Sequence, residues 1–153
     1  MTAATDLVLT STEAGVTTVT MNRPEALNAL SAGLRNRLTE VFTDLTEDSA
    51  TEVIIFTGKG RAFTVGLDLK ELGGETAADT VVSKDLGKAM LNVNKPIIGA
   101  INGYAITGGF ELALMCDFML ASEHAKFADT HARVGVVPGW GLSQRLPRLI
   151  GIN

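Results

Sequence analysis

Apolar and polar residues along the chain follow two spacings, and these predict a succession of strands and helices. Residues 7–10 and 16–21 are rich in β-branched and apolar residues and flank a turn at 13–15, which predicts two paired strands. From Ser31, a suitable helix N-cap, apolar residues recur at three- and four-residue intervals to about Glu47. The first third of the chain therefore predicts a strand pair followed by an amphipathic helix.

The rest of the chain continues this alternation. Short apolar runs predict buried strands at 53–57, from Pro96 onward, and at 117–121. Helical patterns cover four further segments: a short turn at 67–72, then 77–92, a stretch starting near Gly109, and 143–150. The other segments, including most of 122–142, are predicted to be loops.

Strands that alternate with helices favour an α/β architecture with parallel strands. Periodicity alone equally permits a Rossmann-like sheet. The chain shows no clear internal repeat, no low-complexity segment and no linker, so residues 1–153 are predicted to form a single domain.

The most informative segment is a glycine pair, Gly108 and Gly109, which follows an apolar strand and opens a helix with Glu111 in its first turn. The first N–H groups of a helix lack partners inside the helix and carry its positive dipole end. Glycine lets a ligand approach such a backbone closely. This arrangement suits the stabilisation of negative charge on an oxygen, with Glu111 as a neighbouring base.

Overall composition narrows the classes of partner. Hydrophobic residues make up 46% of the 153 residues and charged residues 20%, as in ordinary soluble globular proteins. A net charge of -4 argues against a nucleic-acid or membrane-surface partner, since both require a basic face. The N-terminus lacks the pattern of a signal peptide, and no apolar run approaches transmembrane length. These features predict a cytoplasmic protein.

The single cysteine excludes an internal disulfide and fits a reducing compartment. Cys116 lies in an apolar run and is predicted to be a small buried hydrophobic residue. His124 is expected at the surface. A Ser143–His131 nucleophile pair is rejected, because no third orienting group and no nucleophile elbow accompany it.

Four motifs follow one another along nearly the whole chain. They are MNRPEALNAL at 21–30, GKGRAFTVGLDL at 58–69, PIIGAINGYAITGGFELA at 96–113 and PGWGLSQRL at 138–146. In this order they resemble the enoyl-CoA hydratase/isomerase (crotonase) superfamily. The resemblance implies a right-handed spiral of repeated β-β-α turns in place of a Rossmann sheet.

The same resemblance implies an enzyme that acts on an acyl-CoA thioester through an enolate-like state, with no metal or redox cofactor and with coenzyme A as part of the substrate. By motif match, the amides of Leu67 and Gly108 would stabilise the charge on the thioester oxygen. Glu111 matches one of the two glutamates that hold and activate water in hydratases of this family.

His131 occupies the position of the family's second glutamate, within Phe127-Ala128-Asp129-Thr130-His131. Histidine can hold a water molecule or donate a proton, so a carboxylate–histidine pair can still perform acid–base work. Equally, the change can abolish hydration and leave a single-base isomerase or another reaction on the same enolate, such as dehalogenation or decarboxylation. An acyl-CoA-binding protein without turnover is the alternative outside the enzymes.

Family patterns also imply a set of substrate contacts. They are Ala26, Leu27, Ala62, Val65, Gly66, Leu67, Asp68, Leu69, Lys70, Gly108, Gly109, Pro138 and Gly139. Within this set Asp68 fits a helix cap better than a catalytic role. The basic residues Lys59 and Arg61 are further candidates for contact with the anionic coenzyme A. Trp140 is equally compatible with an acyl contact and with core packing.

Family members normally continue beyond the position of Asn153 into a C-terminal helical segment that covers the acyl-CoA site and builds the trimer. The chain is therefore expected to be the spiral core without that segment, either as a fragment or as a shortened member. A homo-oligomer, trimer or hexamer, is expected if the full-length chain is longer.

Overall fold

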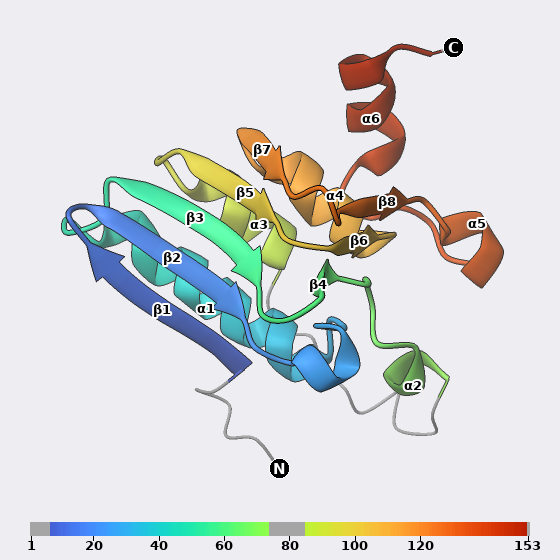
Figure 1. Ribbon diagram of the computed structural model, residues 1–153, viewed down its shortest axis with the longest axis horizontal. Coiled ribbons are helices and arrows are strands. Elements are labelled where there is room, and N and C mark those ends of the chain that lie inside the picture. The colour runs from blue at the N-terminus through green and yellow to red at the C-terminus, as the bar shows by residue number, and fades with distance from the viewer. Residues whose placement is uncertain (1–6, 74–84, 153) are drawn as a thin grey trace.

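The computed structural model describes residues 7–73 and 85–152. Its strands and helices follow one another along the chain (Figure 1) as β1 (Val8–Glu13), β2 (Val16–Met21), a 3-10 turn (Pro24–Ala26), α1 (Ala32–Glu47), β3 (Val53–Gly58), β4 (Ala62–Thr64), α2 (Leu69–Leu72), α3 (Leu86–Asn92), β5 (Ile97–Ile101), β6 (Tyr104–Ile106), α4 (Gly108–Met115), β7 (Phe118–Ala121), β8 (Lys126–Ala128), α5 (His131–Val134) and α6 (Leu142–Ile150).

These strands form two sheets. The larger has the order β1-β2-β3-β5-β7 and the smaller the order β4-β6-β8. The β1–β2 hairpin is antiparallel, and the other pairs are parallel. Three times in succession, a strand of the large sheet is followed by a strand of the small sheet and then by helix. This topology confirms the predicted β-β-α spiral and is not that of a Rossmann sheet.

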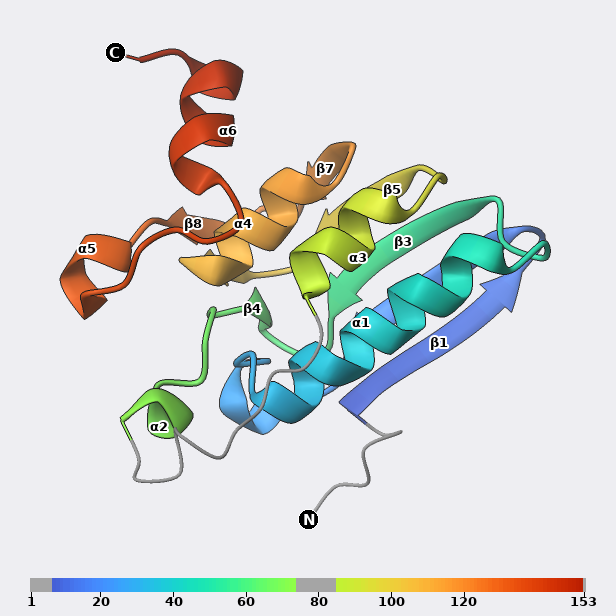
Figure 2. The ribbon, with the colours of Figure 1, turned by 180° about the vertical axis from the view of Figure 1, so that it is seen from behind.

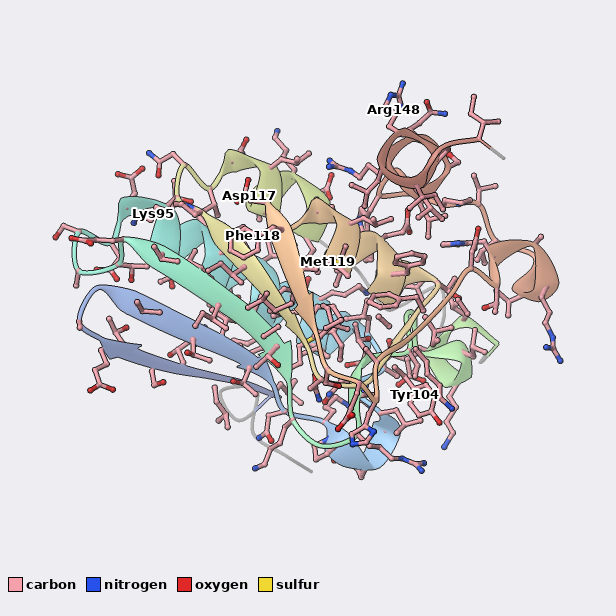
Figure 3. The ribbon with its side chains drawn as sticks, turned by 45° about the horizontal axis from the view of Figure 1, so that its top comes forward. Lys95, Tyr104, Asp117, Phe118, Met119 and Arg148 are labelled. Atoms are coloured by element: carbon pink, nitrogen blue, oxygen red, sulfur yellow. The ribbon has the colours of Figure 1, made fainter. Side chains whose placement is uncertain are left out.

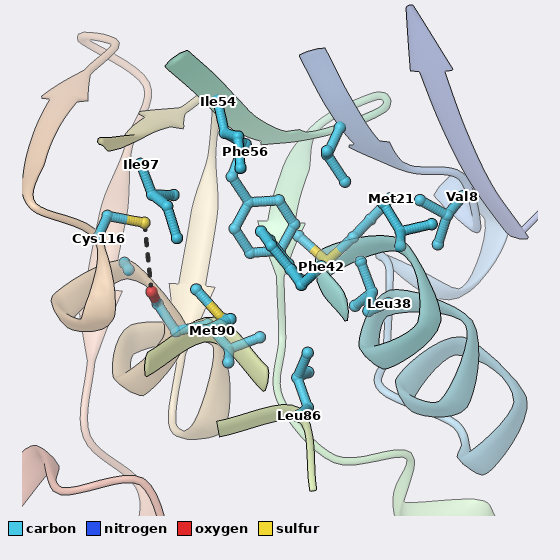
Figure 4. Close-up of a cluster of buried hydrophobic side chains, with 14 of the residues drawn as sticks. Val8, Met21, Leu38, Phe42, Ile54, Phe56, Leu86, Met90, Ile97 and Cys116 are labelled. Carbon is cyan, nitrogen blue, oxygen red and sulfur yellow. Dashed lines mark hydrogen bonds between the residues drawn. The ribbon is translucent and has the colours of Figure 1, made fainter. Parts of the chain in front are cut away.

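Helices α1 and α3 lie side by side across one face of the large sheet, as the view from behind shows (Figure 2). Between them and the sheet, Phe42, Phe56 and Phe63 stack edge to face with ring centroids 5.2 and 5.1 Å apart. Each of the three rings is fully buried, and Figure 4 shows Phe42 of α1 meeting Phe56 of β3. Such aromatic pairs stabilise a core beyond the area that they bury.

Polar contacts fix where the central elements begin and end. The Ser31 hydroxyl accepts a hydrogen bond from the N–H of Leu34, which confirms the predicted N-cap of α1. At the other end of α1, the Lys95 ammonium donates to the carbonyls of Leu45 and Asp48 and so satisfies acceptors that the helix leaves free (Figure 3).

The structure corrects the sequence prediction at the small sheet. Strands β4 and β8 and helix α5 form where loops were expected. Each strand is only three residues long, too short for a periodic pattern, and its pairing is set by β6, which is distant in sequence. Of the helix predicted at 77–92, the structure shows α3 from Leu86, and residues 77–84 lie outside the described part.

Candidate functional site

The parallel strands of the small sheet end on one side of the molecule, and the segments that follow them line a pocket of about 270 Å³. Its walls are mainly apolar, with a few polar groups between them. The lining residues are Arg35, Val65, Leu67, Leu69, Leu72, Thr107, Gly108, Glu111, Thr130, His131, Val134, Val136, Val137, Gly139 and Trp140. A concave apolar site with a few convergent polar groups is typical of small-molecule binding.

Two backbone segments meet at the base of this pocket. Gly66 has φ +85, and a side chain added there would lie 2.9 Å from the carbonyl oxygen of Ile106 and 3.1 Å from the nitrogen of Gly108. The loop after β4 therefore contacts the start of α4 with no room for a Cβ. The predicted pair of amides, from Leu67 and Gly108, is thus carried by adjoining segments that both line the pocket.

The peptide that joins Gly66 to Leu67 has a defined orientation. Its carbonyl accepts a hydrogen bond of 2.8 Å from the N–H of Leu30. In a trans peptide the N–H points opposite to the carbonyl, so the Leu67 N–H faces away from Leu30. Gly108 is the first residue of α4, where an N–H has no acceptor inside the helix. Within residues 7–73 and 85–152, neither amide donates a hydrogen bond.

Glu111 is the most buried carboxylate of the pocket, with 2% of the residue exposed. Its Oε1 accepts hydrogen bonds from the main-chain N–H groups of Trp140, at 2.8 Å, and Leu142, at 3.2 Å. Its Oε2 lies 3.2 Å from Nε2 of His131. Two backbone donors and the first turn of α4 favour a negative charge in this otherwise costly position.

His131 joins Glu111 from the other side, at the start of α5, and is itself 5% exposed. Its Nδ1 lies 2.6 Å from Oδ1 of Asp129, and the same oxygen accepts from its main-chain N–H at 3.0 Å. The pKa of the Asp129 carboxyl is held below its usual range, mainly because the main-chain N–H of His131 donates to it. Burial raises this pKa, and the contact with the imidazole lowers it further. His131 is thus hydrogen-bonded to Asp129 on one side and lies in ion-pair contact with Glu111 on the other.

Hydrogen bonds of Thr107 connect the segment before Glu111 to the segment before His131. It is the N-cap of α4 and has φ 55 and ψ -115, a conformation that residues with a side chain rarely adopt. Its hydroxyl lies 2.5 Å from that of Thr130, and its N–H donates to the carbonyl of Ala128 at 2.8 Å. The turn before Glu111 is therefore tied to the turn before His131.

The predicted substrate contacts are only partly gathered at the pocket. Five of them line it: Val65, Leu67, Leu69, Gly108 and Gly139. Gly66 and Gly109 are buried directly behind them, and a Cβ at Gly109 would lie 2.1 Å from the carbonyl oxygen of Thr64. These two glycines let the backbone segments approach and present their neighbours to the pocket.

The remaining predicted contacts lie at other places. Ala62 is fully buried in β4, and its carbonyl accepts from the Asn28 side chain. Asp68 caps α2 through the N–H of Lys70 and forms an ion pair of 3.1 Å with Arg23, which confirms the predicted cap. Ala26 and Leu27 end the 3-10 turn, Pro138 precedes Gly139, and the basic residues Lys59, Arg61 and Lys70 are exposed.

Sequence reasoning missed Arg35, which reaches the pocket from α1. Burial lowers the pKa of its guanidinium, while the charge of Glu71 raises it. Its Nε is buried and has no hydrogen-bond partner among the residues that the structure describes. In the helical pattern Arg35 falls on a face expected to be solvated, so nothing in its spacing pointed to the pocket. Trp140 both lines the pocket and packs against the core, so each of the two expected roles fits its position.

Cys116 is buried away from this site, as predicted, and donates to the carbonyl of Leu112 (Figure 4). Burial, with a contribution from Asp117, raises the pKa of its thiol from 9.0 to about 12. Since the thiolate is the nucleophile, its fraction at neutral pH falls about 10³-fold.

We expect alkylation of the native protein by iodoacetamide at pH 8 to be slower than that of the unfolded chain by about this factor. Equal rates would show that Cys116 is accessible.

His124 and Ser143 are both exposed, as expected for residues outside the site. Among the described residues, no three His, Cys, Asp or Glu side chains are arranged to hold a metal ion. No helix in that part of the chain is both long and apolar enough to cross a membrane.

Comparison with known proteins gives concordant similarities in sequence and structure. The family model described as enoyl-CoA hydratase/isomerase matches residues 11–153. A protein of Arabidopsis thaliana named probable enoyl-CoA hydratase 1, peroxisomal, is 49% identical over 146 residues, covering 91% of this chain. The enoyl-CoA hydratase of Rhizobium meliloti, also named as probable, is 42% identical over 148 residues and 95% of this chain.

Among solved structures, that of enoyl-CoA hydratase from Mycobacterium tuberculosis H37Rv superimposes with a TM-score of 0.82 at 50% identity, covering 96% of this chain and 62% of that one. The chain spans 53% of the length of the Arabidopsis protein and 58% of the Rhizobium protein. The similarity therefore covers nearly all of this chain but only part of each of these relatives.

Proposed function

Because the chain belongs to the enoyl-CoA hydratase/isomerase family, we propose that it processes an α,β-unsaturated acyl-CoA thioester by adding water. The observation that carries the proposal is the close approach of Gly66 to Gly108 beside the buried carboxylate of Glu111. Two amides and a base in one pocket are the groups that an enolate-forming reaction requires.

In the proposed reaction, the amides of Leu67 and Gly108 donate to the thioester oxygen. Glu111 Oε2 takes a proton from water, and the water oxygen bonds to the β-carbon. The electrons of the carbon–carbon double bond then move onto the thioester oxygen as an enolate. Return of the proton to the α-carbon collapses the enolate, so the protein ends the turnover with the protons it started with.

Each oxyanion donor of this kind contributes about 2.7–4 kcal/mol to lowering the barrier. Glu111 supplies the base because its Oε1 is held by two main-chain N–H groups, which leaves Oε2 toward the pocket and His131. His131 assists by contacting that oxygen. The apolar walls from α2 and α5 suit the hydrocarbon part of an acyl chain.

Only water and protons move in this scheme, so the proposed reaction uses no metal or redox cofactor and coenzyme A enters as part of the substrate. A homo-oligomeric full-length protein, trimer or hexamer, and a cytoplasmic location remain predictions from sequence. The relatives include one protein named as peroxisomal and one named as mitochondrial.

The test is incubation of the purified chain with a small panel of saturated and unsaturated acyl-CoA esters, followed by mass spectrometry. We expect crotonyl-CoA to gain the mass of one water. A shifted double bond, or loss of halide or carbon dioxide from a suitable ester, would replace hydration by another reaction on the same enolate. Calorimetric binding without any product would identify an acyl-CoA-binding protein and overturn the proposed activity.

A further inference from the structure

Asp129, His131 and Glu111 contact one another in turn from the surface into the pocket, through a hydrogen bond between Asp129 and His131 and an ion-pair contact between His131 and Glu111. The Asp129 side chain is 42% exposed, whereas those of His131 and Glu111 are 6% and 3% exposed. The two contacts on the imidazole measure 2.6 Å at Nδ1 and 3.2 Å at Nε2. The imidazole therefore lies between the solvent-exposed carboxylate of Asp129 and the buried carboxylate of Glu111.

Proton positions follow from the donors and acceptors. An ionised carboxylate only accepts hydrogen bonds, and the lowered pKa of Asp129 keeps it ionised near neutral pH. Its Oδ1 then requires a proton on Nδ1 of His131. On the opposite side, Nε2 lies 3.2 Å from Oε2 of Glu111, and two lone pairs would face each other at this contact unless one of the two atoms carries a proton. That proton belongs either to an imidazolium or to a neutral carboxylic acid.

We propose that Asp129 is a positioning residue, which keeps Nδ1 of His131 protonated and thereby dedicates Nε2 to exchanging a single proton with Glu111. The inference rests on the proposed function, because it assigns Asp129 to the protonation of the proposed base. A neutral histidine without this partner can carry its proton on either ring nitrogen, and the carboxylate at Nδ1 selects the form protonated there.

The other charges around His131 agree with one shared proton. The charged groups that line the pocket are Glu111 from α4 and Arg35 from α1, in addition to His131 itself. Arg35 is in turn influenced by Glu71 of α2, and Arg133 of α5 is exposed. With the shared proton in place, the pair of Glu111 and His131 carries no net charge. Without it, the site would hold an uncompensated negative charge in a poorly solvated place.

Nitrogen NMR of ¹⁵N-histidine-labelled protein tests this assignment without any need for turnover. The chain contains two histidines, and His124 is exposed, so it serves as an internal reference. Across about pH 5 to 9, we expect Nδ1 of His131 to remain protonated in the parent protein. Asp129→Asn should populate the form of His131 protonated only at Nε2, because an amide can offer an N–H to Nδ1 where the carboxylate can only accept.

Glu123→Gln is the matched control, since it removes an exposed carboxylate beside His124 and leaves Asp129 in place. It should leave the His131 resonances unchanged. An unaltered proton position on the His131 ring in folded Asp129→Asn would overturn the proposal. If that variant does not fold, the parent spectrum still decides, because an imidazole protonated only at Nε2 would contradict the assignment.

Turnover gives a second, separable readout. We expect Asp129→Asn to shift the pH dependence of kcat for crotonyl-CoA while KM stays within about twofold, as a positioning residue should. Absence of product from the parent protein would refute the proposed function and leave the NMR result standing. Normal hydration with an unchanged pH profile and an unchanged proton position on His131 in the variant would refute the role of Asp129 alone.

Discussion

Replacing Glu111 with glutamine is expected to lower the turnover of crotonyl-CoA by about 10²–10⁴-fold, the usual contribution of a general acid–base group. The amide oxygen can still accept from the N–H groups of Trp140 and Leu142, which hold Oε1 in the parent protein. The second position loses its basic oxygen, so no group of this residue can take a proton from water. Steady-state kinetics with purified protein provide the measurement.

Glu47→Gln is a suitable control for this experiment, because Glu47 is an exposed carboxylate at the end of α1. It removes the same charge away from the pocket and should leave kcat within about twofold of the parent value. Should Glu111→Gln turn over at the parent rate with an unaltered unfolding temperature, Glu111 is not the base and the proton must pass through another group.

Gly66→Ala should lower kcat by about 10²–10³-fold, the cost of losing one oxyanion donor. The new Cβ would meet the carbonyl oxygen of Ile106 at 2.9 Å, which is backbone and cannot move aside cheaply. The left-handed backbone at φ +85 adds about 1–2 kcal/mol of strain. Both effects push the loop that carries the Leu67 amide away from Gly108, so the donors no longer converge.

Gly15→Ala separates catalysis from stability in this comparison. Gly15 has a similar φ of +80, but it lies in the β1–β2 hairpin, and the atoms nearest to an added Cβ belong to the side chain of Glu52. We expect Gly15→Ala to lose the thermal stability that follows from its left-handed φ, with kcat unchanged. If Gly66→Ala loses no more activity than Gly15→Ala, the Leu67 amide does not take part in the reaction.

The long elements were predictable from sequence because local patterns and tertiary contacts agree in them. In α1, for example, the buried residues Leu34, Leu38 and Phe42 repeat at helical spacing behind a serine cap. Strands β4 and β8 were not predictable, because three residues carry no period and their partner is β6. The assignment of the region after Ser122 as loop was therefore wrong for β8 and α5.

At the site, several residues that line the pocket were predicted from the sequence, whereas the contacts among their side chains were not. Glu111, His131, Leu67 and Gly108 do line one pocket. The contact of Asp129 with His131 was missed, since two residues on one short segment give no signal of which side chains meet. Thr107 was missed for a different reason: its positive φ is imposed by tertiary contacts, and threonine by itself does not suggest it.

The order of the spiral has a consequence for how this pocket can change its chemistry. Each segment that follows a strand of the small sheet carries different functional groups. The amide of Leu67 follows β4, the amide of Gly108 and the carboxylate of Glu111 follow β6, and Asp129 and His131 follow β8. These groups come from different connections, so a substitution in one can alter the reagent while the neighbouring frame stays in place. The fold thus allows the residue on one connection to be replaced without moving the others, and His131 lies on such a connection.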